Sequence, residues 1–109
     1  MPSTPKPPSG KRASPPRSAD YTKSFFKDWE RLSRAGRHSM RQLKEAMLLL
    51  IANDRPLGAE WPDHPLKGEW ADCRECHIGG DFLLIYQVRG NAINFIRAGT
   101  PCGVVLMKN

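Results

Sequence analysis

Four polar residues in the second half of the chain have the types needed to cleave a phosphodiester bond: His64, His77, Asp81 and Arg97. An imidazole exchanges protons near neutral pH, and a carboxylate can orient it or act as a base. A guanidinium can hold a non-bridging phosphate oxygen through charged hydrogen bonds. With RNA as substrate, the 2′-hydroxyl can be the nucleophile, so this set predicts a chemistry that requires no metal.

Two amphipathic helices are expected before these residues. Apolar side chains recur every three or four positions over 21–32 and again over 40–51, the spacing of a buried helical stripe. Gly36 is expected to end the first helix, and Ser39 with Gln42 has the spacing of a capping box at the start of the second. The short connection predicts an antiparallel helix hairpin.

Three strands are expected after the helices. Residues 71–78 form a candidate strand, 82–88 is an almost continuous apolar run typical of the centre of a sheet, and 92–97 alternates between apolar and polar. Two helices followed by a strand meander predict an α+β fold, with the helix hairpin packed on one face of a small antiparallel sheet.

This strand order brings the candidate residues to one end of the sheet. His77 ends the first strand, Asp81 follows the next turn, and Arg97 ends the strand that returns beside them, while His64 enters from the preceding loop. Geometry alone favours a structural interpretation, in which Asp81 shapes the turn, His77 is half-buried and Arg97 pairs with any of the 11 acids. The residue types leave both interpretations open.

The composition fits one small domain. The chain has 109 residues, of which 39% are hydrophobic, a formal charge of +6 and a mean hydropathy of -0.54. No apolar run approaches the roughly 20 residues of a membrane helix, and the first 19 residues lack the apolar core of a secretory signal. These features predict a cytoplasmic protein.

The first 19 residues differ from the rest of the chain. They hold six of the ten prolines and four basic residues, with no acid and no large apolar side chain after Met1. Such a segment cannot offset its own ordering entropy, so 1–19 is expected to be a disordered basic arm before a domain over 20–100. The arm is interpreted as a solvated tail, with weak attraction to RNA phosphates as the functional alternative.

The cysteines do not predict a cofactor. Cys73, Cys76 and His77 match the C-x-x-C-H pattern of haem attachment, but that attachment normally requires export, and the odd spacing places the two thiols on opposite faces of a strand. A zinc site needs about four ligands, and the chain has no second cysteine pair. We therefore expect no haem, no metal and no other cofactor.

Several motifs, taken together and in order, resemble those of a bacterial toxin family. They are Asp63-His64-Pro65-Leu66, Gly68-Glu69-Trp70, Arg74-Glu75-Cys76-His77-Ile78, Gly80-Asp81-Phe82-Leu83-Leu84-Ile85-Tyr86 and Arg97-Ala98-Gly99-Thr100. With these motifs, residues 21–100 resemble a YafQ-type toxin of the RelE/ParE superfamily, whose members are bacterial type II toxins that cut mRNA on the ribosome. The resemblance implies the same arrangement of a helix hairpin on a small sheet.

The resemblance also implies a site and partners. The family's active-site residues correspond to His64, His77, Asp81 and Arg97. It implies attack by the 2′-hydroxyl to give a 2′,3′-cyclic phosphate without a metal. We expect RNA contacts from Lys67, Arg74 and Phe82. The expected partners are the ribosome with its mRNA and a cognate DinJ/RelB-like antitoxin.

The last nine residues, 101–109, depart from the family pattern. After Gly-Thr the family has a catalytic His and then a Leu-Phe ending, whereas here Pro101 follows Thr100 and no aromatic residue comes after it. Because proline has no titratable group, the chain is expected to be an impaired nuclease. The alternative is a non-catalytic protein on the same scaffold, either a pseudo-toxin that binds antitoxin or a ParE-like inhibitor of a protein target.

One inserted base would account for this tail. Residues 101–107 can be encoded CCA-TGC-GGT-GTT-GTT-CTG-ATG, and removal of one C gives CAT-GCG-GTG-TTG-TTC-TGA. The second reading encodes His-Ala-Val-Leu-Phe and a stop, which is the family ending. This hypothesis fails if codons 101–106 of the gene cannot give that reading after one deletion.

Overall fold

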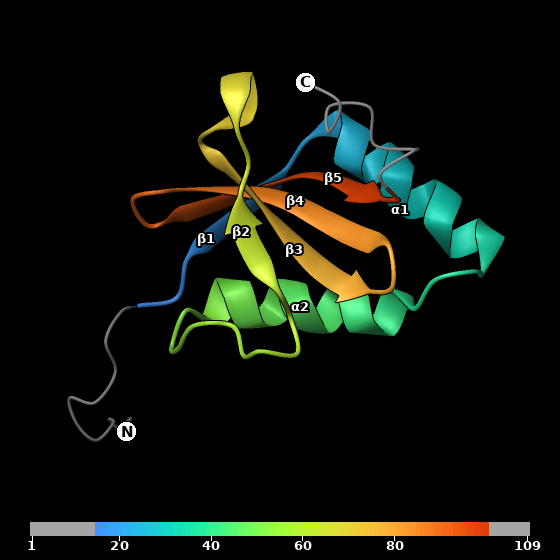
Figure 1. The fold of residues 1–109 in the computed structure, drawn as a ribbon, viewed down its shortest axis with the longest axis horizontal. Coiled ribbons are helices and arrows are strands. Elements are labelled where there is room, and N and C mark those ends of the chain that lie inside the picture. Colours follow the sequence, from blue (N-terminus) through green and yellow to red (C-terminus); the bar gives the residue numbers. More distant parts are fainter. Residues whose placement is uncertain (1–14, 101–109) are drawn as a thin grey trace, which may run out of the picture.

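The computed structural model describes residues 15–100, which form two helices and five strands (Figure 1). The helices are α1 (Lys23–Ala35) and α2 (Met40–Ala52), with a short 3₁₀ turn η2 (Gly68–Trp70). The strands are β1 (Ser18–Tyr21), β2 (Asp63–Pro65), β3 (Cys73–Gly79), β4 (Phe82–Arg89) and β5 (Ala92–Gly99). The α+β fold predicted from the sequence is confirmed.

Local capping sets the bounds of both helices. The Thr22 hydroxyl accepts a hydrogen bond from the N–H of Phe25 at 2.9 Å, and the Ser39 hydroxyl accepts one from the N–H of Gln42 at 3.1 Å. Gly36 ends α1 in the left-handed conformation, with φ of 68°, as predicted. The chain reverses between the helices, and both contribute side chains to one core (Figure 1). Neither helix of residues 15–100 has the length and apolar character needed to cross a membrane.

The sheet is mixed, with the strand order β1-β5-β4-β3-β2. Strands β3, β4 and β5 form the predicted antiparallel meander. β1 pairs parallel to β5, which the sequence did not indicate, because its four residues are all exposed and carry no strand pattern. Ser18 and Ala19, expected to lie in the arm, are therefore strand residues. The rest of the arm up to residue 14, and the tail 101–109, lie outside the described residues.

The residues just before β1 are hydrogen-bonded to the C-terminal end of α2. The Arg17 N–H donates to the carbonyl of Ile51 at 2.8 Å, and its guanidinium donates to the carbonyl of Leu50 at 2.6 Å. The Asn53 side chain donates to the carbonyl of Pro15 at 3.0 Å. The two bonds from Arg17 satisfy carbonyls at the C-terminal end of α2, which have no partner within the helix.

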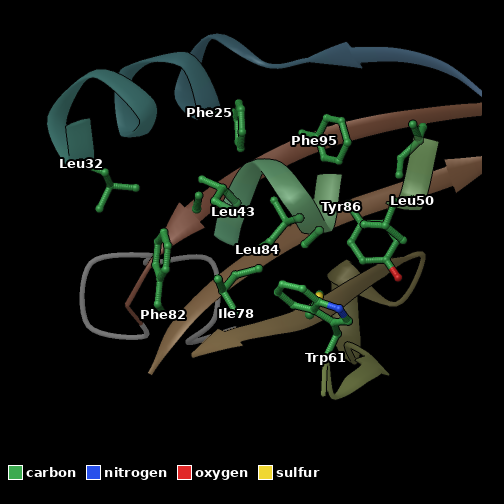
Figure 2. Packing of buried hydrophobic residues seen from close by; sticks show 14 residues of the cluster. Phe25, Leu32, Leu43, Leu50, Trp61, Ile78, Phe82, Leu84, Tyr86 and Phe95 are labelled. Atoms are coloured by element: carbon green, nitrogen blue, oxygen red, sulfur yellow. The ribbon is translucent and has the colours of Figure 1, made fainter. Parts of the chain in front are cut away.

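The central strand β4 is buried on both faces, as its apolar sequence predicts. On the helix side the core is built around large side chains (Figure 2), among them Phe25, Leu32, Leu43, Leu50, Trp61, Ile78, Phe82, Leu84, Tyr86 and Phe95. On the other face Cys73 and Ile85 pack with Leu66, Trp70 and Ile96. The helices therefore cover one face of the sheet, and the 66–70 segment covers part of the other.

Candidate active site

The two predicted histidines both contact the carboxylate of one glutamate. His64 Nε2 lies 3.5 Å from one carboxylate oxygen of Glu75, and His77 Nε2 lies 3.6 Å from the other. The two imidazole centroids are 5.6 Å apart. Only 8% of the Glu75 side chain is exposed, against 53% for His64 and 35% for His77. A nearly buried carboxylate is thus covered by two accessible imidazoles.

The strand register explains this meeting. His64 of β2 pairs directly with Glu75 of β3. Glu75 and His77 are two residues apart on β3, so their side chains share a face. Glu75 also pairs with Ile85 of β4, whose side chain packs on the face away from the helices. β2 has only three residues and was expected to be a loop, yet its pairing with β3 fixes the position of His64.

Arg97 lies in the same cross-sheet row. It pairs with Ile85, which pairs in turn with Glu75, so two strand spacings, or about 10 Å, separate the backbones of Arg97 and Glu75. β1 ends at Tyr21 opposite Phe95, and α1 begins there, beside the last residues of β5. The register therefore places Arg97 two strands away from Glu75, which the interpretation of the sequence missed and which both histidines contact.

A buried acid of α1 holds Arg97 in place. Its Nε and Nη2 donate to the two carboxylate oxygens of Asp28 at 2.7 and 3.1 Å. The Asp28 side chain is 2% exposed and also accepts from the Ala98 N–H and from Arg31, each at 3.0 Å. The sequence left the partner of Arg97 open among 11 acids. One signal was available, since Asp28 falls on the buried stripe of α1 with Phe25.

This pair remains charged at neutral pH. Burial raises the pKa of Asp28, but hydrogen bonds from Arg97, the Ala98 N–H and Arg31 lower it, and its net pKa lies below the ordinary 3.8. The hydrogen bond to Asp28 raises the pKa of Arg97 in turn. Arg97 is therefore a fixed cation at the edge of the candidate site.

Asp81 and Lys67 are exposed residues outside the strands. Asp81 is exposed in the turn between β3 and β4, and no ion pair or hydrogen bond within residues 15–100 joins it to either histidine. Lys67 is exposed immediately before η2. The role expected of each stays a prediction.

Arg74 and Phe82 lie away from the histidines. Arg74 pairs in register with Tyr86, whose side chain belongs to the helix-side core, and its Nε donates to Asp63 at 2.6 Å. It therefore occupies the opposite face of the sheet. Phe82 is 2% exposed and stacks on His38 with centroids 4.5 Å apart. Its burial gives it a packing role instead of the RNA contact expected from the sequence.

The buried thiols are not available to a shared metal site with His77. Cys76 belongs to the core on the helix side and Cys73 to the cluster on the other face, which confirms that the two point in opposite directions. Burial raises the pKa of Cys73, and raises that of Cys76 to about 12. Both thiols therefore stay protonated at neutral pH.

Comparison with known proteins agrees with this architecture. Residues 17–102 match the family model described as bacterial toxin of type II toxin-antitoxin system, YafQ. The chain is 38% identical over 84 residues to the mRNA interferase toxin YafQ of Escherichia coli K12, covering 77% of this chain and 90% of that protein. It is 36% identical over 73 residues to a putative toxin YafQ of Haemophilus influenzae, covering 66% and 72%.

Solved structures show the same fold. The toxin of the E. coli DinJ-YafQ toxin-antitoxin complex superposes with a TM-score of 0.75 at 35% identity, over 81% of this chain and 96% of that one. A metal-bound toxin from Helicobacter pylori superposes with a TM-score of 0.71 at 32% identity, over 81% and 98%. The two helices on a five-stranded sheet thus define a small α+β toxin fold. The chain belongs to the YafQ family of toxins of bacterial type II toxin-antitoxin systems.

Proposed function

We propose that this chain is an endoribonuclease toxin that cleaves mRNA on the ribosome, with His64, Glu75, His77 and Arg97 as its core site. The observation that carries the proposal is the contact of both imidazoles with one nearly buried carboxylate, in register with a fixed guanidinium. Relatives at 38% identity are named mRNA interferases, which supports the same activity here.

The reaction requires two proton transfers and stabilisation of charge. The substrate 2′-oxygen attacks the adjacent phosphorus and gives up its proton to a base, while the bond from phosphorus to the 5′-oxygen breaks and that oxygen takes a proton from an acid. The products are a 2′,3′-cyclic phosphate and a 5′-hydroxyl. An imidazole of the cluster accepts or donates these protons, and Glu75 offsets its charge when it is protonated. Arg97 stabilises the phosphate oxygens as negative charge builds.

Two residues outside the cluster of His64, Glu75 and His77 are part of this proposal. Asp81, in the turn that follows His77, is the further candidate for proton transfer, and Lys67 is the candidate for contact with RNA phosphates. We also propose an antitoxin partner of the DinJ type, because solved relatives are described as DinJ-YafQ complexes.

The tail is expected to reduce the rate of cleavage. Pro101 occupies the position at which the family has a histidine, and one general acid or base typically contributes on the order of 10²–10⁴ in rate. We expect a version ending His-Ala-Val-Leu-Phe after Thr100 to cleave faster than the given chain by about this factor. Equal rates would show that the missing histidine is not needed.

The test maps cleavage sites on mRNA in a translating ribosome system by primer extension, using the version with the restored ending as background. We expect Glu75→Gln, His64→Gln and His77→Gln to cleave more slowly by at least about tenfold. His38→Gln is the matched control, because His38 stacks on Phe82 on the helix side of the sheet. The proposal fails if Glu75→Gln and His77→Gln cleave as fast as His38→Gln.

The second candidate is a non-catalytic antitoxin-binding protein, favoured by Pro101 alone. It predicts that the given chain binds antitoxin but produces no new mRNA ends. Primer extension and a pull-down with a DinJ-type antitoxin, made on the same preparation, separate the two functions.

A further inference from the structure

We infer that His64, Glu75 and His77 form a binding site for one late first-row divalent cation, with Zn²⁺ as the representative ion, and that this ion switches the nuclease off. The binding is independent of the function proposed above, whereas the switching rests on it. The inference reverses the expectation from the sequence that the chain binds no metal, an expectation that considered only sites involving the cysteines.

The spacing of the three side chains suits such an ion. Metal–ligand distances of about 2.0–2.2 Å in a tetrahedral site place neighbouring ligand atoms about 3.4 Å apart. Here each histidine Nε2 lies 3.5 or 3.6 Å from an oxygen of Glu75, and ligand atoms of all three residues fall within 4.8 Å of one another. A small rotation of the exposed imidazoles is enough to close the site.

The chemistry of the ligands selects the ion. Two imidazole nitrogens and one carboxylate oxygen are the protein ligands of one class of zinc site, in which a water takes the fourth position. Imidazole also suits Cu²⁺ and Ni²⁺, whereas Mg²⁺ prefers an octahedral set of oxygens. Both histidines are exposed enough for an ion to enter, while Glu75 is held almost out of solvent beneath them.

The backbone also orients one ligand. His64 Nδ1 lies 3.4 Å from the carbonyl of Pro65, so an Nδ1–H can point at that oxygen while Nε2 keeps its lone pair toward Glu75. Metal-binding histidines usually carry such a second partner, which fixes the ring and the tautomer. The direct pairing of β2 with β3 holds His64 opposite Glu75 before any ion arrives.

Occupancy of this site and RNA cleavage exclude each other. A bound ion takes the lone pair of each histidine and the charge of Glu75, so neither imidazole can accept or deliver a proton. Zn²⁺ at stoichiometric concentration is therefore expected to inhibit cleavage, and a chelator is expected to restore it.

The test uses the full chain without a histidine tag, and calorimetric titration with Zn²⁺ and Mg²⁺. We expect one Zn²⁺ per chain and no Mg²⁺ binding. Zn²⁺ binding should be weakened by each of His64→Gln, Glu75→Gln and His77→Gln. The loss should be at least about 10–100-fold, which is the loss in affinity when a hydrogen-bond partner of a metal ligand is replaced. His38→Gln should leave it unchanged, since His38 lies outside the cluster. Thermal unfolding of each variant without metal reports whether it has folded.

Paramagnetic resonance of Cu²⁺ gives a readout that does not depend on activity. Coupling to two imidazole nitrogens is expected in the given chain and to one in His77→Gln. The inference is overturned if Zn²⁺ does not bind, if His38→Gln binds as weakly as His77→Gln, or if saturating Zn²⁺ leaves cleavage unchanged. If the chain binds Zn²⁺ but cleaves no mRNA even without the ion, the proposed function is refuted and the metal site stands.

Discussion

The buried ion pair between Asp28 and Arg97 ties α1 to the last strand of the sheet. Its carboxylate is almost fully out of solvent and accepts four hydrogen bonds: two from Arg97, one from Arg31 and one from the Ala98 N–H. Substitution Asp28→Asn keeps the shape of the side chain but removes its charge and turns an amide donor toward one of these donors. We expect this change to destabilise the fold.

The size of the effect follows from the burial of the pair. Removal of one partner of a buried ion pair costs about 3–5 kcal/mol. The Arg97 side chain is 21% exposed, so water can partly solvate it, and we expect the lower end, about 3 kcal/mol. At roughly 4–8 °C per kcal/mol for a domain of this size, Tm should fall by about 12–24 °C.

Urea unfolding followed by circular dichroism measures this free energy. Glu30→Gln is the matched control, because Glu30 is an exposed acid of the same helix and its change should stay within about 0.5 kcal/mol. A double-mutant cycle with Arg97→Gln should give a coupling of about 1–3 kcal/mol. The reasoning is refuted if Asp28→Asn unfolds within 0.5 kcal/mol of the Glu30→Gln control, or if the cycle shows no coupling.

The pH dependence of the same pair has a fixed sign. Because the pKa of Asp28 is lowered in the folded state, its stabilisation is complete above the unfolded value near 3.8 and is lost as pH falls through the lower folded value. The gap in unfolding free energy between the unmodified chain and Asp28→Asn should therefore be constant from pH 5 to 7 and shrink below pH 4. A gap that stays constant down to pH 2 would contradict this assignment.

Further predictions concern Tyr86 and the two buried thiols. The Tyr86 hydroxyl donates to the Asp63 carboxylate, so Tyr86→Phe should lower the unfolding free energy by about 1.5–3 kcal/mol, measured by urea unfolding; no loss would mean that the bond contributes nothing. Burial and that bond raise the pKa of Tyr86, so stability should fall as pH rises above about 10, the value in the unfolded chain, and Tyr86→Phe should show a smaller fall. In a Cys102→Ser background, a thiol reagent at pH 8 should label neither Cys73 nor Cys76 until urea unfolds the protein, and rapid labelling in the native state would show that these thiols are not buried.

Local patterns in the sequence were sufficient for both helices and for strands β3, β4 and β5, but not for β1 and β2. Helix limits at Gly36 and Ser39 are set by hydrogen bonds within three or four residues, and the apolar run over 82–88 shows in itself that both faces of β4 are buried. The order of strands and turns then placed His77 and Arg97 on neighbouring parts of the sheet.

Contacts between residues distant in sequence were decided only by the assembled sheet. In the sequence, Glu75 is only one charged residue of a predicted strand. The pairing of β2 with β3 places it beneath His64. Asp28 and Arg97 are 69 positions apart, and the place of Asp28 on the buried stripe of α1 does not show which cation it meets. The sequence therefore determined which groups the strands and helices carry. The side-chain partners of those groups depend on the register between strands and on how α1 packs, because both are set by the burial of apolar side chains from the whole chain at once.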